Sequence, residues 1–77
     1  WTIAPNPASG LVMLQFEYPQ EQTVRVHLSD VAGRVVLQSD EPVAAGFNQI
    51  SLDVSRLPAG MYWVNLPGLS PQTLLKH

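Results

Sequence analysis

Residues 24–38 read VRVHLSDVAGRVVLQ, and this stretch decides the fold class. In its first half, Val24, Val26 and Leu28 alternate with polar residues. Because successive side chains of a β-strand point to opposite faces, an alternation of this kind is typical of a strand with one buried face. The stretch therefore predicts a half-buried strand at its start.

A turn follows this strand, from Asp30 to Gly33. Aspartate at the first position of a turn accepts a backbone N–H, and glycine tolerates a positive φ. The chain then returns through Arg34 to Gln38 as an antiparallel partner, so the whole stretch predicts a β-hairpin. We expect Arg34 to pair with Asp30 across the turn.

The same period-two pattern extends in both directions along the chain. Residues 39–46 lack strict alternation and predict either a longer connection or a weak edge strand. Turn residues separate the strand signals about every 8–12 residues, and no window has helical spacing. About seven short strands predict an all-β fold, a small immunoglobulin-like antiparallel β-sandwich. The strand signals lie at residues 1–4, 12–18, 24–29, 34–38, 50–54, 61–66 and 73–76.

Length and composition limit the possible functions. The 77 residues form one domain, spanning 1–77, which we expect to be a module of a larger secreted protein because it begins with Trp1 and has no signal peptide of its own. The formal net charge is −2, which argues against a nucleic-acid partner. The longest apolar run, Leu11 to Leu14, is too short to cross a bilayer, so no membrane insertion is predicted.

Residues with catalytic or metal-binding potential are few and scattered. His27 with Ser29 and a nearby aspartate would need a cleft and an oxyanion hole to act as a triad, so we interpret it as a solvated strand residue. The histidines and aspartates lack metal-ligand spacing, and the doublet Asp40-Glu41 is interpreted as a solvated turn. The sequence predicts no catalytic residue, no metal and no cofactor.

Apolar residues also fall on the face opposite Tyr62 and Val64, where an outward patch is possible. Met61 and Trp63 occupy this face, and Leu11 and Met13 are predicted to extend the same patch. An exposed apolar patch of this kind marks a docking or carbohydrate-stacking surface. The alternative, which we favour for Met61 and Trp63, is that these side chains cover a neighbouring domain or the edge of a sheet.

Four short motifs occur in order along the chain, followed by a lysine close to the last residue. Together they resemble the C-terminal sorting domain of proteins exported by the type IX (Por) secretion system of Bacteroidota, and the resemblance extends from Ile3 to Lys76. The motifs are Pro5-Asn6-Pro7, Asp30-Val31-Ala32-Gly33-Arg34, Gly46-Phe47-Asn48 and Leu57-Pro58-Ala59-Gly60-Met61-Tyr62.

The resemblance implies a targeting signal and not an enzyme. It implies that type IX secretion components recognise the folded, monomeric domain in the periplasm, for export across the outer membrane. A sortase-like processing protease would then remove the domain, and the cargo would be attached to the cell surface or secreted. By match to the family's lysine-containing end, the implied recognition tail consists of Thr73, Leu74, Leu75, Lys76 and His77.

Most motif residues also have structural interpretations. Asn6 with Pro7 is expected to form a turn in which the Asn side chain bonds its own backbone two residues on. Leu57 is expected to plug the end of the core, and Gly60 to hold a backbone angle closed to other residues that leads Tyr62 inward. The motif residues to be located in the structure are Asn6, Pro7, Asp30, Gly33, Arg34, Gly46, Asn48, Leu57, Gly60 and Tyr62.

Two other functions stay open on the sequence alone. One is an accessory carbohydrate-binding or fibronectin-III-like module of a secreted enzyme, in which Trp63 would stack on sugar rings. The other is a structural spacer with no ligand.

Overall fold

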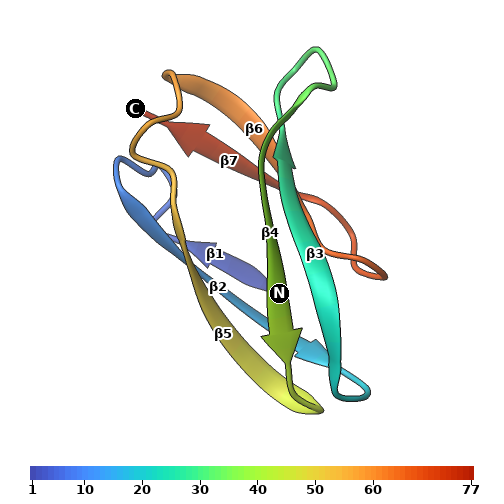
Figure 1. Cartoon of the computed structure of the whole chain (residues 1–77). Coiled ribbons are helices and arrows are strands. Elements are labelled where there is room, and N and C mark those ends of the chain that lie inside the picture. The colour runs from blue at the N-terminus through green and yellow to red at the C-terminus, as the bar shows by residue number, and fades with distance from the viewer.

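The structure, a computed structural model, describes all of residues 1–77 as two packed antiparallel sheets with no helix. The three-stranded sheet has the order β1-β2-β5 and the four-stranded sheet the order β4-β3-β6-β7, as Figure 1 shows. The predicted all-β sandwich of seven short strands is therefore confirmed. The strands are β1 Thr2–Ala4, β2 Leu11–Tyr18, β3 Gln22–Ser29, β4 Val35–Val43, β5 Gly46–Asp53, β6 Gly60–Asn65 and β7 Gln72–Lys76.

The order in which the chain changes sheets follows the immunoglobulin-like pattern. The first two strands lie in one sheet, the third lies in the other, and the sixth and seventh return to the sheet of the third. In the constant-type antibody domain the fourth strand belongs to the first sheet. Here β4 pairs with β3, which makes the sheet containing β7 the larger one.

The core forms where the alternating apolar residues of both sheets meet. Fifteen buried residues make up one cluster. Leu14 of β2, Leu28 of β3 and Leu74 of β7 have no exposed surface. Fully burying a leucine side chain contributes about 1.5–3 kcal/mol, so these positions carry much of the stability of a domain that has no cysteine. The strand faces predicted from alternation are thus correct for the inward residues.

The strand β4 includes the first part of residues 39–46, for which the sequence left open a longer connection or a weak edge strand, and the edge-strand alternative is correct there. The strand continues to Val43 as the edge strand of its sheet and pairs with β3 as far as Gln22. Pro42 is tolerated there because an edge strand has one unpaired side. The doublet Asp40-Glu41 therefore lies in a strand and not in the predicted turn. Asp40 instead accepts hydrogen bonds from Arg25 at 2.8 and 3.3 Å, which lower the pKa of its carboxyl.

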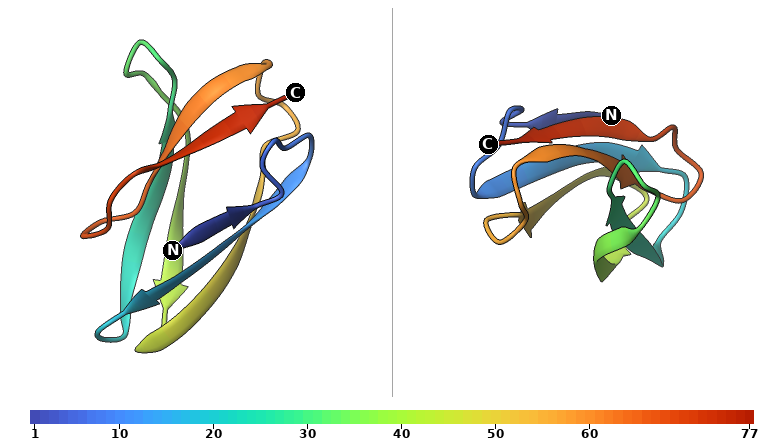
Figure 2. Two further views of the ribbon diagram at one scale, coloured as in Figure 1. Left: turned by 180° about the vertical axis from the view of Figure 1, so that it is seen from behind. Right: turned by 90° about the horizontal axis from the view of Figure 1, so that it is seen from above.

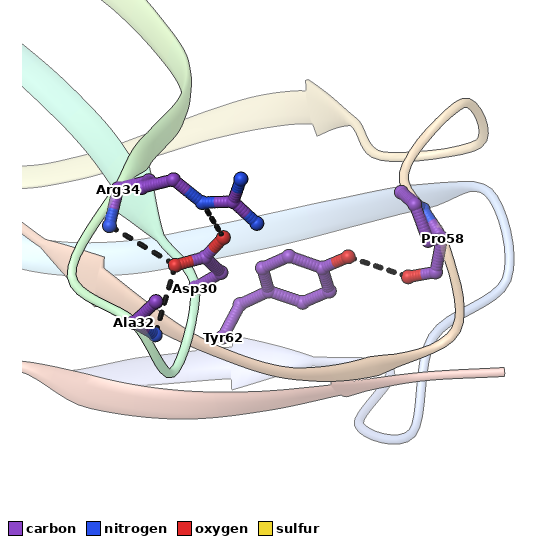
Figure 3. A network of polar contacts seen from close by, with 5 residues as sticks. All are labelled: Asp30, Ala32, Arg34, Pro58 and Tyr62. Atoms are coloured by element: carbon purple, nitrogen blue, oxygen red, sulfur yellow. Dashed lines mark hydrogen bonds and ion pairs between the residues drawn. The ribbon is translucent and has the colours of Figure 1, made fainter.

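The turn between β3 and β4 has the predicted geometry, shown in Figure 3. One oxygen of Asp30 accepts the backbone N–H groups of Ala32 and Arg34, each at 3.0 Å. The other oxygen accepts the Arg34 Nε–H at 2.9 Å, so the predicted ion pair is confirmed. Gly33 has a φ of 85°, which glycine adopts without the clash of a Cβ. The backbone N–H of Arg34, followed by its side chain and the Ala32 N–H, holds the pKa of Asp30 below its ordinary value.

This lowered pKa predicts an acid-dependent contribution to stability. The Asp30 charge stabilises the folded state at neutral pH, and that stabilisation is lost as the pH falls through the folded-state pKa. Asp30→Asn keeps an oxygen for the two N–H groups but removes the charge, so we expect it to melt below the wild type at neutral pH. The difference in Tm should close in acid, as thermal melts across the pH range would show. A difference that is constant with pH would contradict a role for the charge.

The terminal strand as a candidate recognition site

The predicted recognition tail, residues 73–77, is part of the folded sandwich. Thr73 to Lys76 lie in β7, which pairs with β6 over its whole length. Leu74 stands opposite Tyr62 of β6 and is completely buried. A partner that reads this tail in the folded domain therefore meets a strand whose conformation is already fixed.

The first residues of the chain run beside β7 and form what we call the N-terminal arm, residues 1–8 (Figure 2). Trp1 lies at its start, where the indole Nε1–H donates to the carbonyl of Ser70 at 2.8 Å. The Gln72 side chain in turn donates to the carbonyl of Trp1 at 3.0 Å. These two hydrogen bonds hold the first residue of the chain against Ser70 and Gln72, at the point where β7 begins.

Further along, the arm occupies the edge of β7 that faces away from β6. The Asn6 Nδ2–H donates to the carbonyl of Thr73, and the Leu75 N–H donates to Asn6 Oδ1, each at 3.0 Å. Ala8 continues the pairing, since its N–H donates to the Leu75 carbonyl at 2.8 Å and its carbonyl accepts the His77 N–H at 2.9 Å. The side-chain amide of Asn6 acts here as a peptide group would in a neighbouring strand.

The expected local turn at Asn6 is therefore wrong in its hydrogen bonding. The Asn6 amide contacts residues 67 and 69 positions away instead of its own backbone two residues on. An Asn-Pro pair indicates a break in regular structure, but nothing local in the sequence tells which distant strand the amide will reach. Asn6 is thus a contact residue of the recognition tail, which sequence reasoning did not reveal.

The tail divides into an inward and an outward row. Leu74 and Lys76 point into the sandwich and are buried, whereas Thr73, Leu75 and His77 are exposed. Lys76, which is 8% exposed, donates from Nζ to the carbonyl of His77 at 3.1 Å. Long cationic side chains bury their aliphatic stem while the charged end reaches a polar partner. The tail lysine is therefore a packed residue of the sandwich end.

This packing predicts different results for two substitutions of Lys76. Lys76→Ala removes the buried stem and is expected to lower stability by about 1 kcal/mol. Lys76→Met removes the charge but keeps an unbranched chain of similar length, so it should restore most of the loss. Urea unfolding of the three proteins measures both effects. If Lys76→Met were as unstable as Lys76→Ala, the ammonium contact would be the stabilising feature and not the stem.

The motif from Leu57 to Tyr62 has the structural roles predicted for it. Gly60 has a φ of 150° at the start of β6, and Tyr62 follows it into the core with its hydroxyl donating to the Pro58 carbonyl at 2.5 Å (Figure 3). Leu57 packs against the core from the loop before β6. These positions fix the course of β6, which is the partner strand of the tail.

Asn48 performs a similar structural role at the turn between β4 and β5. Its Nδ2–H groups donate to the carbonyls of Ala44 and Gly46, and its Oδ1 accepts the Ala44 N–H at 2.8 Å. Gly46 begins β5 with a φ of 93°. Both motif asparagines therefore hydrogen-bond to backbone through their side chains, Asn48 at a turn and Asn6 at the tail.

The residues considered for chemistry are not brought together. Asp30 is occupied by Arg34, and Asp53 accepts the Ser55 N–H at 2.9 Å, with the hydrogen bonds from Ser55 lowering its pKa. Neither carboxylate is bonded to His27. No group of three or more histidine, aspartate or glutamate side chains gathers at one place. The structure has no helix with the length and apolarity needed to span a membrane.

The predicted apolar patch is correct in part. Met61 and Trp63 do point outward from β6 and are exposed. Leu11 and Met13 cannot extend that patch, because β2 belongs to the three-stranded sheet and its outward residues lie on the opposite side of the sandwich. Alternation shows which side of its own sheet a residue occupies, but not which sheet a strand joins. The actual neighbour of Met61 is Leu75, directly across from it on β7.

Fold and site together define a small β-sandwich whose last strand is held between β6 and the start of the chain. The model of the secretion system C-terminal sorting domain family matches residues 2–76, and the chain belongs to this family. Comparison with curated proteins and with solved structures found no significant match. The domain is thus a C-terminal sorting signal of type IX secretion, which interacts with that machinery and directs its protein to a secreted or cell-surface destination. Nothing supports the carbohydrate-binding alternative.

Proposed function

We propose that the type IX machinery recognises this domain in its folded, monomeric form in the periplasm, and that strand β7 is the element it reads. The observation that carries this proposal is the position of the tail. Residues 73–76 are part of β7, and β6 and the N-terminal arm hold that strand on both edges. A signal with this structure is presented only when the sandwich is folded.

Removal of the domain completes the proposed function. A sortase-like protease cuts the chain before the sandwich, and the cargo is attached to the cell surface. The domain has no catalytic role of its own, in keeping with the separate hydrogen-bond partners of its aspartates. It acts as the substrate of both the secretion machinery and the protease.

An export assay tests this function. A fluorescent cargo with its own inner-membrane signal peptide is fused to residues 1–77 and expressed in a host that has the type IX machinery. We expect delivery to the surface or the medium, with the cargo shortened by the 8.5 kDa of the domain. The matched controls are the cargo without the domain and the same fusion in a host lacking the machinery.

Point substitutions are preferable to removing the tail in this assay. Deleting residues 72–77 would remove all of β7 and take the buried Leu74 from the core. Periplasmic retention of the wild-type fusion, with the domain shown to be folded by circular dichroism, would contradict the proposed function. Delivery of a cargo that keeps the domain would contradict the proteolytic step alone.

A further inference from the structure

Three large apolar side chains form an exposed group on the outer face of β6 and β7, which we call the outer patch. Met61, Trp63 and Leu75 are 49%, 43% and 45% exposed. Met61 stands directly opposite Leu75, and Trp63 stands opposite Thr73, which places Leu75 diagonally across from Trp63. Directly opposite and diagonal neighbours on one face of a sheet are within contact distance for large side chains. The three residues therefore form one continuous surface.

The backbone of the tail offers little to a partner. The backbone N–H and C=O groups of residues 72, 74 and 76 point toward β6. The opposite edge of β7 is occupied by the arm. The Thr73 carbonyl, both backbone groups of Leu75 and the His77 N–H already have partners in Asn6 and Ala8. Recognition by adding a strand to this edge would first require that the arm leave it. A partner that reads β7 in the folded domain must therefore use side chains.

Only one row of tail side chains is open to such a partner. Leu74 and Lys76 are buried, so the exposed ones are Thr73, Leu75 and His77. Leu75 is the apolar member of this row, and its neighbours on the same face are Met61 and Trp63 of β6. Any protein surface that contacts Leu75 from outside also covers the outer patch.

The surroundings of the patch indicate the chemistry of the partner. The cross-strand row through Trp63 consists of Thr73, Ser29 and Val35 and carries no charge. Farther along β3 on the same face, Arg25 is neutralised by Asp40 at 2.8 Å. An uncharged row with large apolar side chains, on a face where Arg25 is already paired with Asp40, complements an apolar protein surface.

We propose that a protein of the type IX machinery binds the domain through an apolar surface that covers Met61, Trp63 and Leu75. This inference rests on the proposed function, in which β7 is read in the folded state, and it names the surface and the kind of contact. It also gives the aromatic residue of the rival carbohydrate-binding hypothesis a role in protein binding.

The export assay with the unrelated fluorescent cargo tests the inference through two single substitutions. Trp63→Thr and Leu75→Thr remove the large apolar side chain and put in its place threonine, a β-branched residue suited to a strand. We expect each to reduce delivery on the order of tenfold, as loss of a central interface contact does, with the Tm close to that of the wild type. Trp63→Phe should retain most of the delivery.

Phe47→Thr is the matched control. Phe47 is an exposed aromatic residue of β5, on the outer face of the three-stranded sheet, and is 61% exposed. We expect this variant to be delivered as well as the wild type. A similar loss of delivery in the Phe47 variant would overturn the assignment of the contact to β6 and β7.

The remaining outcomes separate this inference from the proposed function. If the wild-type fusion is delivered and the Trp63 and Leu75 variants are delivered equally well, the inference is wrong and the proposed function stands. That result would mean that the patch covers a neighbouring domain in the parent protein. If sedimentation shows a dimer that the variants dissolve, the patch is a contact between copies and the inference is overturned. If the wild-type fusion stays in the periplasm, both proposals fail.

Discussion

Replacing Leu74 with alanine is expected to lower the free energy of unfolding by about 2–5 kcal/mol. Leu74 has no exposed surface and lies in the core cluster opposite Tyr62. The truncation removes buried methyl groups and leaves a cavity that the surrounding strands fill only in part. In a domain of this size each kcal/mol shifts the Tm by about 4–8 °C, so the variant should melt well below the wild type.

The adjacent residue provides the control for this prediction. Leu75→Ala changes the same side chain one position later, on the outward face of β7, where it is 45% exposed. Its effect on stability should stay within about 0.5 kcal/mol. Urea unfolding of the two variants compares them directly. Equal losses would show that the inward and outward rows of the tail are wrongly assigned.

The second large effect is expected at Asn6. Asn6→Ala removes two hydrogen bonds, one to the Thr73 carbonyl and one from the Leu75 N–H. At about 0.5–1.5 kcal/mol each, the loss amounts to about 1–3 kcal/mol. The destabilisation should be confined to the outer edge of β7, because the freed Thr73 carbonyl and Leu75 N–H both lie there. Amide hydrogen exchange should therefore quicken at Leu75, whose N–H loses its acceptor, while the amides of β3 keep their protection.

Asn48→Ala is the matched variant for this experiment. Asn48 has the same side chain and three hydrogen bonds to backbone, at the turn between β4 and β5 (Figure 1). We expect a comparable fall in Tm without a change in the exchange of Leu75, and with export retained by the folded fraction. The export of the Asn6 variant should fall further than its Tm accounts for. Equal export of the two variants at equal stability would mean that the arm has no part in presenting the tail.

The sequence was sufficient for the sandwich because burial of one face imposes a period of two on each strand. That period places Leu14 and Leu28 inward, and the structure buries both completely. The pattern is weaker in β4, since an edge strand packs less of its surface, so the sequence leaves residues 39–46 open as a longer connection or a weak edge strand. The turn at Asp30 was predictable because all its hydrogen bonds are local.

The candidate site was less accessible to sequence reasoning because its contacts join distant residues. The tail was located by resemblance to a family. The spacing of residues along the chain does not predict that Asn6 bonds to the tail or that Leu75 lies opposite Met61. Leu11 and Met13 were placed on the correct side of their strand and on the wrong side of the molecule. The missed contact of Asn6 and the misplacement of Leu11 and Met13 have the same origin, because local periodicity specifies neither which strands pair nor which sheet a strand joins.

The direction in which the arm runs has a mechanical consequence. Ala8 pairs with the end of β7 in parallel orientation. If the secretion machinery holds β7 while the cargo, attached ahead of residue 1, pulls on the other end, the force acts along the two segments and not across them. Once the pairing of β1 with β2 has opened, the hydrogen bonds of Asn6 and Ala8 bear the load in shear, at the same time, instead of opening one after another. A sorting domain built in this way resists unravelling during transport in the direction in which its own cargo would pull it apart.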